Sequence, residues 1–152
     1  MVKVMATGTF DLLHMGHIYY LKEAKKLGDK LVVVVATDST VRRLKHEPVN
    51  PEATRLNLIK ELEVVDEAYL GYEEDIYEIV EEIKPDIIAL GYDQTHNEKD
   101  IISDLKKRKI NAKVVRLSEY KQGSDLEGTR KIISKIISAY EFQKNMERIE
   151  GK

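Results

Sequence analysis

Residues 4–17 read Val-Met-Ala-Thr-Gly-Thr-Phe-Asp-Leu-Leu-His-Met-Gly-His, an apolar run that passes into a turn with two glycines and two histidines. The apolar run predicts a strand over residues 2–6. Apolar residues at helical spacing follow over residues 18–27, and Gly28 is typical of a helix end. A strand, a tight turn and a helix in this order predict the first half of a βαβ unit.

The rest of the chain repeats this alternation of short apolar runs and amphipathic stretches. The run over residues 31–36 is largely β-branched, which is typical of a strand buried on both faces. Further strands are predicted over residues 64–70, 86–90 and 113–117, and helices over residues 54–62, 76–83, 101–105 and 128–142. We therefore predict an α/β fold, a Rossmann-like five-stranded parallel sheet flanked by helices.

The length and the last predicted helix both bear on domain organisation. A chain of 152 residues suits one domain with a single core, over residues 1–152. The last helix has an apolar face that could cover the sheet, made by Ile132, Ile133, Ile136, Ile137 and Tyr140. The residues after Phe142 are mostly polar, so we expect the last ten or so to fray.

Composition excludes several classes of function. The net charge of −2, from 25 basic and 27 acidic residues, lacks the basic excess of most nucleic-acid binders. The chain has no cysteine, which excludes disulfides, a thiolate nucleophile and cysteine-ligated zinc. We expect no signal peptide and no membrane span, because the longest apolar run, residues 31–36, is far too short. The cytoplasm is the expected compartment.

The predicted topology places four loop segments at one crevice. Open parallel sheets bind ligands beyond the carboxyl ends of their strands, where the strand order reverses. The segments that follow predicted strands at this edge span residues 7–17, 37–45, 91–95 and 118–130. We expect the functional side chains to lie among them.

The first segment has the residue types of a phosphate site. Gly8 and Gly16 allow close approach of the backbone to a ligand, and the N–H groups that open a helix suit phosphate oxygens. His14 and His17 add neutral or cationic donors. The segment is neither a Walker A loop nor a dinucleotide fingerprint. Zinc binding would need further ligands, which the pair alone does not supply.

Two later segments carry polar or aromatic residues directly after predicted strands. Asp93 follows Gly91 and could accept hydrogen bonds from ribose hydroxyls or a base amine, with Gln94 beside it. A plain turn would also tolerate glycine and aspartate. Tyr120 could pack against a nucleotide, or form a half-buried aromatic rim.

These motifs resemble the cytidylyltransferase-like nucleotidyltransferase superfamily, which includes glycerol-3-phosphate cytidylyltransferases, phosphopantetheine adenylyltransferase and archaeal FAD synthases. The resemblance rests on residues 8–17 and covers the chain from Val4 to about Ile137. The Gly-x-Asp-Gln form of residues 91–94 is more similar to archaeal FAD synthases than to glycerol-phosphate cytidylyltransferases, where Gly-Asp-Asp-Trp is usual. The resemblance implies ATP as donor and FMN as acceptor.

The resemblance also implies roles for residues of the first segment. His14 and His17 would stabilise the charge that develops on the α-phosphate. Thr9 and the backbone near Phe10 would hold phosphate oxygens, and Asp11 would orient His14 or a metal. The remaining nucleotide-binding positions in this turn are Met15 and Gly16.

Basic residues and a hydroxyl in other segments have roles implied by the same resemblance. Lys45 would reach the triphosphate or the acceptor, or else belongs to a solvated basic face. Arg55 stands where similar enzymes often carry a nucleotide-binding arginine, although a structural salt bridge explains it nearly as well. Thr129 matches the second position of the superfamily's Ser-Ser/Thr-x-x-Ile helix start, where it would meet the β- and γ-phosphates. Gly128 replaces the first serine, and Arg130 either supplies charge there or is solvated. Arg42 and Arg43 are expected to be solvated.

The implied reaction is in-line attack of an acceptor phosphate on the α-phosphorus, which needs positioning rather than a general base. Mg²⁺ would arrive with the triphosphate instead of binding a protein cage. The resemblance also favours a homodimer. Alternatives are CTP-dependent transfer to glycerol 3-phosphate or a similar small phosphate, and a nucleotide-binding sensor without catalysis. A purely structural α/β domain leaves the glycines and histidines of one turn unexplained.

Overall fold

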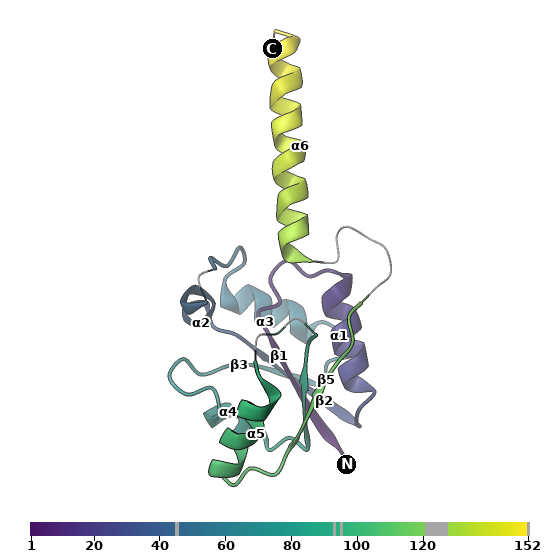
Figure 1. Cartoon of the computed structure of the whole chain (residues 1–152). Helices are drawn as coiled ribbons and strands as arrows, with labels where there is room; N and C mark the ends of the chain where they lie inside the picture. Colours follow the sequence, from purple (N-terminus) through teal and green to yellow (C-terminus); the bar gives the residue numbers. More distant parts are fainter. Residues whose placement is uncertain (45, 93, 95, 121–127, 152) are drawn as a thin grey trace.

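The computed structural model describes residues 1–44, 46–92, 94, 96–120 and 128–151 (Figure 1). Its elements are β1 (Lys3–Gly8), α1 (Met15–Lys25), β2 (Lys30–Val35), α2 (Asp38–Arg43), α3 (Glu52–Lys60), β3 (Glu67–Leu70), α4 (Glu78–Ile83), β4 (Ile87–Leu90), α5 (Glu98–Lys107), β5 (Lys113–Arg116) and α6 (Thr129–Ile149). The strands form one parallel sheet in the order β3-β2-β1-β4-β5. This confirms the predicted Rossmann-like fold.

The strand order reverses at β1, the central strand of the sheet. The chain first moves outward from β1 through β2 to β3, and then returns to place β4 and β5 on the other side. The loops that leave the carboxyl ends of β1 and β4 therefore run apart, which opens a crevice between them.

Side chains alternate between the two faces of the sheet and build a hydrophobic core on each. In β1, Val4 and Ala6 pack on the face covered by α1 and α3, whereas Met5 packs on the face covered by α4 and α5. In β2, every residue from Leu31 to Val35 is buried, in agreement with the β-branched run. The sheet is thus covered on both faces, which suits an all-parallel arrangement.

Helix α2 is an element that the sequence pattern did not predict. It begins after Thr37, whose hydroxyl oxygen accepts a hydrogen bond from the backbone N–H of Thr40 at 3.2 Å. It buries Val41 alone, whereas α4, which is equally short, buries three residues at helical spacing, so α2 lacks the apolar periodicity that predicts a helix. The threonine cap was the available signal.

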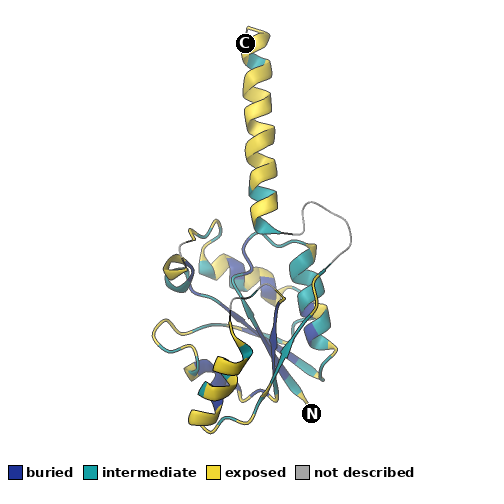
Figure 2. Ribbon diagram, in the orientation of Figure 1, coloured by how far each residue is buried: buried dark blue, intermediate teal, exposed yellow. Residues whose placement is uncertain are grey.

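Helix α6 projects away from the α/β body (Figures 1 and 2). None of its described residues, 129–149, is buried. The idea that its apolar face covers the sheet is therefore wrong: Ile136 is 58% exposed and Tyr140 is 59% exposed. The helix continues to Ile149, beyond the point where fraying was expected. Within the described residues, no helix is long and apolar enough to cross a membrane.

Candidate active site

The four predicted crevice segments meet at the carboxyl ends of β1 and β4. The segment that follows β1 accepts a hydrogen bond from two of the other three, and one from Ala36, directly before the remaining segment. These bonds join Ala36 N to Gly8 O (2.9 Å), Gln94 Nε2 to Thr7 O (2.7 Å) and Thr129 Oγ1 to Asp11 O (2.9 Å). The loops expected to share one edge of the sheet are therefore joined there in the folded chain.

The two histidines cap the first helix with their own side chains. His14 is the N-cap of α1, and its Nδ1 accepts a hydrogen bond from the N–H of Gly16 at 3.1 Å. His17 Nδ1 accepts in turn from the N–H of His14 at 3.4 Å. The two rings stack with their centroids 3.8 Å apart. A local capping box thus fixes both imidazoles before any ligand binds.

This geometry sets the protonation of the pair. An Nδ1 atom that accepts a backbone hydrogen bond carries no proton, so each neutral ring holds its proton on Nε2. Burial, and secondarily the neighbouring His14, lower the pKa of His17 to about 3. His17 is therefore a neutral Nε2–H donor at physiological pH. The sequence left a neutral and a cationic ring open, and the lowered pKa excludes the cationic form for His17.

The side chain of Phe10 supports His17 from the core side. Phe10 is 2% exposed, and its ring centroid lies 5.5 Å from that of His17 and 6.2 Å from that of Tyr20. A Cβ atom at Gly8 would come within 2.9 Å of the Phe10 ring. Gly8 therefore makes room for this ring. Phe10 has a positive φ of 54° and offers a ligand its backbone alone.

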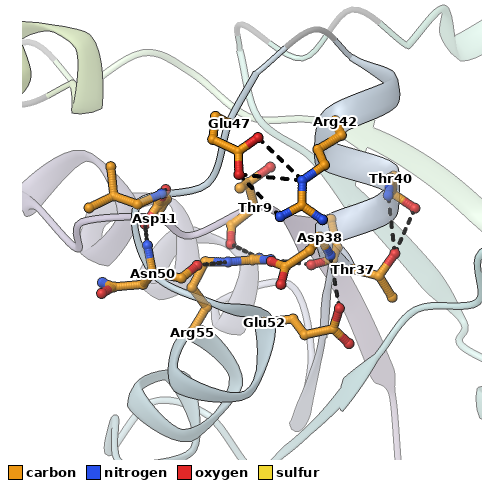
Figure 3. A network of polar contacts seen from close by, with 12 residues as sticks. Thr9, Asp11, Thr37, Asp38, Thr40, Arg42, Glu47, Asn50, Glu52 and Arg55 are labelled. Atoms are coloured by element: carbon orange, nitrogen blue, oxygen red, sulfur yellow. Dashed lines mark hydrogen bonds and ion pairs between the residues drawn. The ribbon is translucent and has the colours of Figure 1, made fainter.

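The carboxylate of Asp11, expected to orient His14 or a metal, is engaged by the backbone of a neighbouring loop. Its carboxylate accepts hydrogen bonds from the N–H groups of Val49, at 2.6 Å, and Asn50, at 3.0 Å (Figure 3). It is 8% exposed and anchors the loop that precedes α3. Among the described residues, no group of three or more histidine, aspartate or glutamate side chains could hold a metal ion.

Arg55 is a fully buried hub that ties the crevice loops together (Figure 3). Its guanidinium donates to the carbonyls of Asn50 (2.9 Å), Thr9 (2.8 Å) and Ala36 (2.7 Å), and to the carboxylate of Asp38 (2.7 Å). The hydrogen bond from Arg55 lowers the pKa of Asp38. The structural salt bridge considered from the sequence is thus present. Asp38, its partner, was not identified from the sequence.

The loop after β4 is held by backbone contacts. Gln94 Oε1 accepts from the N–H of Gly91 at 2.9 Å, while its Nε2 donates to Thr7. Both ends of the amide contact the backbone. Asp93 and Lys45 lie outside the described residues. Arg116, which the sequence analysis missed, donates to three carbonyls of this loop.

The expected nucleotide contacts near β5 and α6 lie at the rim of the crevice. Tyr120 is half-buried, and its ring centroid lies 5.2 Å from that of Tyr19. The Thr129 hydroxyl opens α6 and bonds to the first segment, as described above. Arg130 is exposed, with Nη2 at 3.5 Å from Nε2 of His46.

Other expected positions are more exposed. Met15 is the first residue of α1 and is 52% exposed. Arg42 pairs with Glu47 on the surface, and Arg43 donates to the carbonyl of Glu73. Both arginines belong to an exposed basic face, as the sequence indicated.

Comparisons with known proteins agree with this architecture. A family model described as cytidylyltransferase-like matches residues 5–147. The chain is 58% identical over 137 residues to an FAD synthase of Aciduliprofundum boonei, covering 90% of this chain and 91% of that protein. It is 60% identical over 135 residues to an FAD synthase of Methanothermus fervidus, covering 87% and 92%. The crystal structure of a lipopolysaccharide core biosynthesis protein from Thermoplasma volcanium GSS1 matches with a TM-score of 0.79 and 57% identity, over 80% of this chain and 99% of that one.

Proposed function

This chain belongs to the cytidylyltransferase-like family and is a nucleotidyltransferase, and we propose that it is an FAD synthase, which transfers the adenylyl group of ATP to FMN and releases pyrophosphate. The observation that carries the choice of substrates is the identity of 58–60% to two FAD synthases over about nine tenths of their length. The turn that carries His14 and His17 supports nucleotidyl transfer as the class of reaction.

The proposed chemical step is a single displacement at phosphorus. An oxygen of the FMN phosphate forms a bond to the α-phosphorus of ATP, and the bond from that phosphorus to the bridging oxygen of the β-phosphate breaks. The attacking phosphate is anionic at neutral pH, so no residue has to remove a proton from it. Catalysis then consists of in-line positioning and stabilisation of charge.

We propose that the capped histidines supply this stabilisation. With its Nδ1 atom accepting from the N–H of His14, the neutral His17 ring directs its Nε2–H donor to the α-phosphate oxygens, and His14 is held beside it by the bond from Gly16 N–H to its Nδ1. His17 stays neutral, so it stabilises charge by hydrogen bonding in a preorganised position. The N–H groups at the starts of α1 and α6 would hold the other phosphate oxygens, and the Thr129 hydroxyl, which donates to Asp11 O, would position the start of α6.

We propose that Mg²⁺ binds mainly through triphosphate oxygens and water, the ligands it favours in such sites. The donor set of the described crevice fits this arrangement. The carboxylate of Asp11 is engaged by two backbone N–H groups, and that of Asp38 by Arg55. When bound, the ion would neutralise charge on the phosphates. Loss of activity with a chelator and its return with added Mg²⁺ would test this proposal.

The decisive experiment incubates the purified chain with Mg²⁺, FMN and either ATP or CTP, and separates flavins by chromatography. We expect FAD with ATP. Pyrophosphate release without a flavin product would contradict FMN as acceptor and would favour glycerol 3-phosphate with CTP. Nucleotide binding without any pyrophosphate release would favour the non-catalytic sensor.

We also propose a homodimer in which α6 pairs with α6 of a second copy. The helix exposes Ile136, Ile137, Tyr140 and Phe142, by 51–67%. Its first half carries basic but no acidic side chains, whereas its last ten residues balance Glu141 and Glu147 with Lys144 and Arg148. An antiparallel pair of copies would therefore set the basic half of each helix against the neutral half of the other, and avoid the repulsion between two basic halves. Light scattering should give twice the monomer mass for the wild type and the monomer mass for an Ile136→Glu/Ile137→Glu variant.

A further inference from the structure

We infer that Arg116 is a positioning residue that fixes the loop after β4 at Gly91, Gln94 and His96 and thereby sets the affinity for the donor nucleotide. The inference rests on the proposed function, and it takes this loop as a neighbour of the donor because open parallel sheets bind ligands beyond the carboxyl ends of their strands. Arg116 is the last residue of β5, an edge strand, and lies outside the histidine turn. It would act through the loop without touching the reacting groups.

The guanidinium of Arg116 donates hydrogen bonds to several backbone carbonyls of this loop. Nη1 donates to the carbonyls of Gly91, at 2.7 Å, and Gln94, at 3.0 Å, and Nη2 donates to the carbonyl of His96. Nε forms an ion pair with Glu98, the first residue of α5. Four acceptors from a short stretch of chain therefore converge on one side chain, which is 27% exposed.

This arrangement depends on the shape of arginine. The planar guanidinium presents five N–H donors in a fixed fork, whereas a lysine ammonium presents three donors around a compact centre. A lysine at this position cannot reach all the carbonyls at once. The carboxylate of Glu98 balances the charge of Arg116, and the start of α5 is a favourable place for an anion.

The same loop is tied to the central strand, which connects Arg116 to the crevice. Gln94 bonds to Thr7 in β1, next to the start of the histidine segment, while Arg116 bonds to the carbonyl of Gln94. The loop is thus held between β1 and β5 by two side chains. Losing Arg116 leaves three carbonyls without this donor and frees one side of the loop.

The test compares Arg116→Met with Arg108→Met in the full-length chain. Arg108 is a matched control, because it also forms ion pairs, with Asp75 and Glu81, but it lies on the α4–α5 side of the sheet. ATP affinity is measured by titration calorimetry, and KM and kcat by FAD formation. We expect Arg116→Met to weaken ATP binding about tenfold or more, with kcat at saturating ATP and the KM for FMN within about threefold. Arg108→Met should leave ATP binding unchanged.

Two further variants test the inference through their ATP affinity. Arg116→Lys retains the charge and should still weaken ATP binding, because shape is what matters. Glu98→Gln retains the fold and should have a smaller effect in the same direction, which covers the case in which Arg116→Met does not fold. A twofold or smaller change in ATP affinity for folded Arg116 variants, or an equal change for Arg108→Met, would overturn the inference.

Failure of the inference can be told apart from failure of the proposed function. If the wild type binds ATP but makes no FAD, the proposed acceptor is wrong, and the ATP affinities of the variants still decide the role of Arg116. If the wild type does not bind ATP at all, the inference is overturned together with the proposed donor.

Discussion

Helices α1 and α6 both begin at the crevice, but they are fixed in opposite ways. The first turn of α1 is capped by the stacked His14 and His17, and the helix buries Leu21 and Ala24. Helix α6 begins after Gly128 with no side-chain cap and with no buried residue over its described length. The start of α1 is therefore fixed by packed and capping side chains. The start of α6 is held by the hydrogen bond from the Thr129 hydroxyl to Asp11 O.

This difference suggests that the two helix starts would have separate roles in a phosphate site. A helix start that is held rigidly can align donors with the atom that reacts. A helix start that is loosely held can still meet phosphate groups farther from the reaction, where alignment matters less. The first helix should therefore govern kcat, and the last helix should govern nucleotide binding.

The largest expected effect is on the reaction rate, at His17. Asparagine there retains an oxygen that can accept the bond from His14 N–H but lacks the Nε2 donor. His17→Asn should therefore lower kcat by about 10²–10³-fold with α1 intact. Single-turnover FAD formation measures the loss, and far-ultraviolet circular dichroism reports the helix. An activity near that of the wild type would remove His17 from the proposed chemistry.

The second largest effect is expected on stability, at Arg55. Arg55→Met removes a buried cation and leaves three carbonyls and the Asp38 carboxylate without their donor. We expect a loss of about 3 kcal/mol in the free energy of unfolding, measured with denaturant. Arg42→Met, which breaks a solvent-exposed pair with Glu47, serves as the control and should change stability little. Equal effects would contradict the assigned role.

The third prediction concerns pH and the burial of His17. Its folded pKa is lowered to about 3, below the usual value of 6.5, so the unfolded chain binds more protons between these two values. Stability should therefore fall as the pH drops below about 6.5, at a slope approaching 1.4 kcal/mol per unit. His17→Asn should show a flatter dependence. Denaturation at pH 5 and pH 7 measures the slope, and identical slopes would contradict the burial argument.

The smallest effect is expected at the start of α6. Thr129→Val removes the hydroxyl that donates to Asp11 O while keeping the size of the side chain. We expect the KM for ATP to rise about fivefold, with kcat nearly unchanged. A loss of kcat comparable to that of His17→Asn would erase the contrast between the two helices.

The fold followed from the sequence because its signals are local and repeated. The apolar run and turn of residues 4–17 define a strand that opens a helix, and later runs repeat the pattern. The convergence of the loops then follows from topology. Helix α2 was not predicted because Val41 is its one buried residue, and Arg116 was not predicted because an arginine that ends a strand resembles any surface residue.

The roles of individual polar residues were harder to predict. Asp11 and Gln94 were expected to face a ligand or a histidine, but both contact the backbone of neighbouring loops. A crevice made of irregular chain leaves many N–H and carbonyl groups unpaired, and nearby side chains satisfy them. The sequence gives the type of a polar side chain but not which of these partners it meets.

Because α6 is long, a small tilt at its start moves its far end by a much larger distance. At about 1.5 Å per residue, its 21 residues extend about 30 Å from the crevice. A tilt of about 5° at Thr129 would displace the far end by about 3 Å. Because the start of the helix bonds to Asp11 in the segment after β1, a spectroscopic label near Ile149 would amplify small movements there into a measurable change in distance.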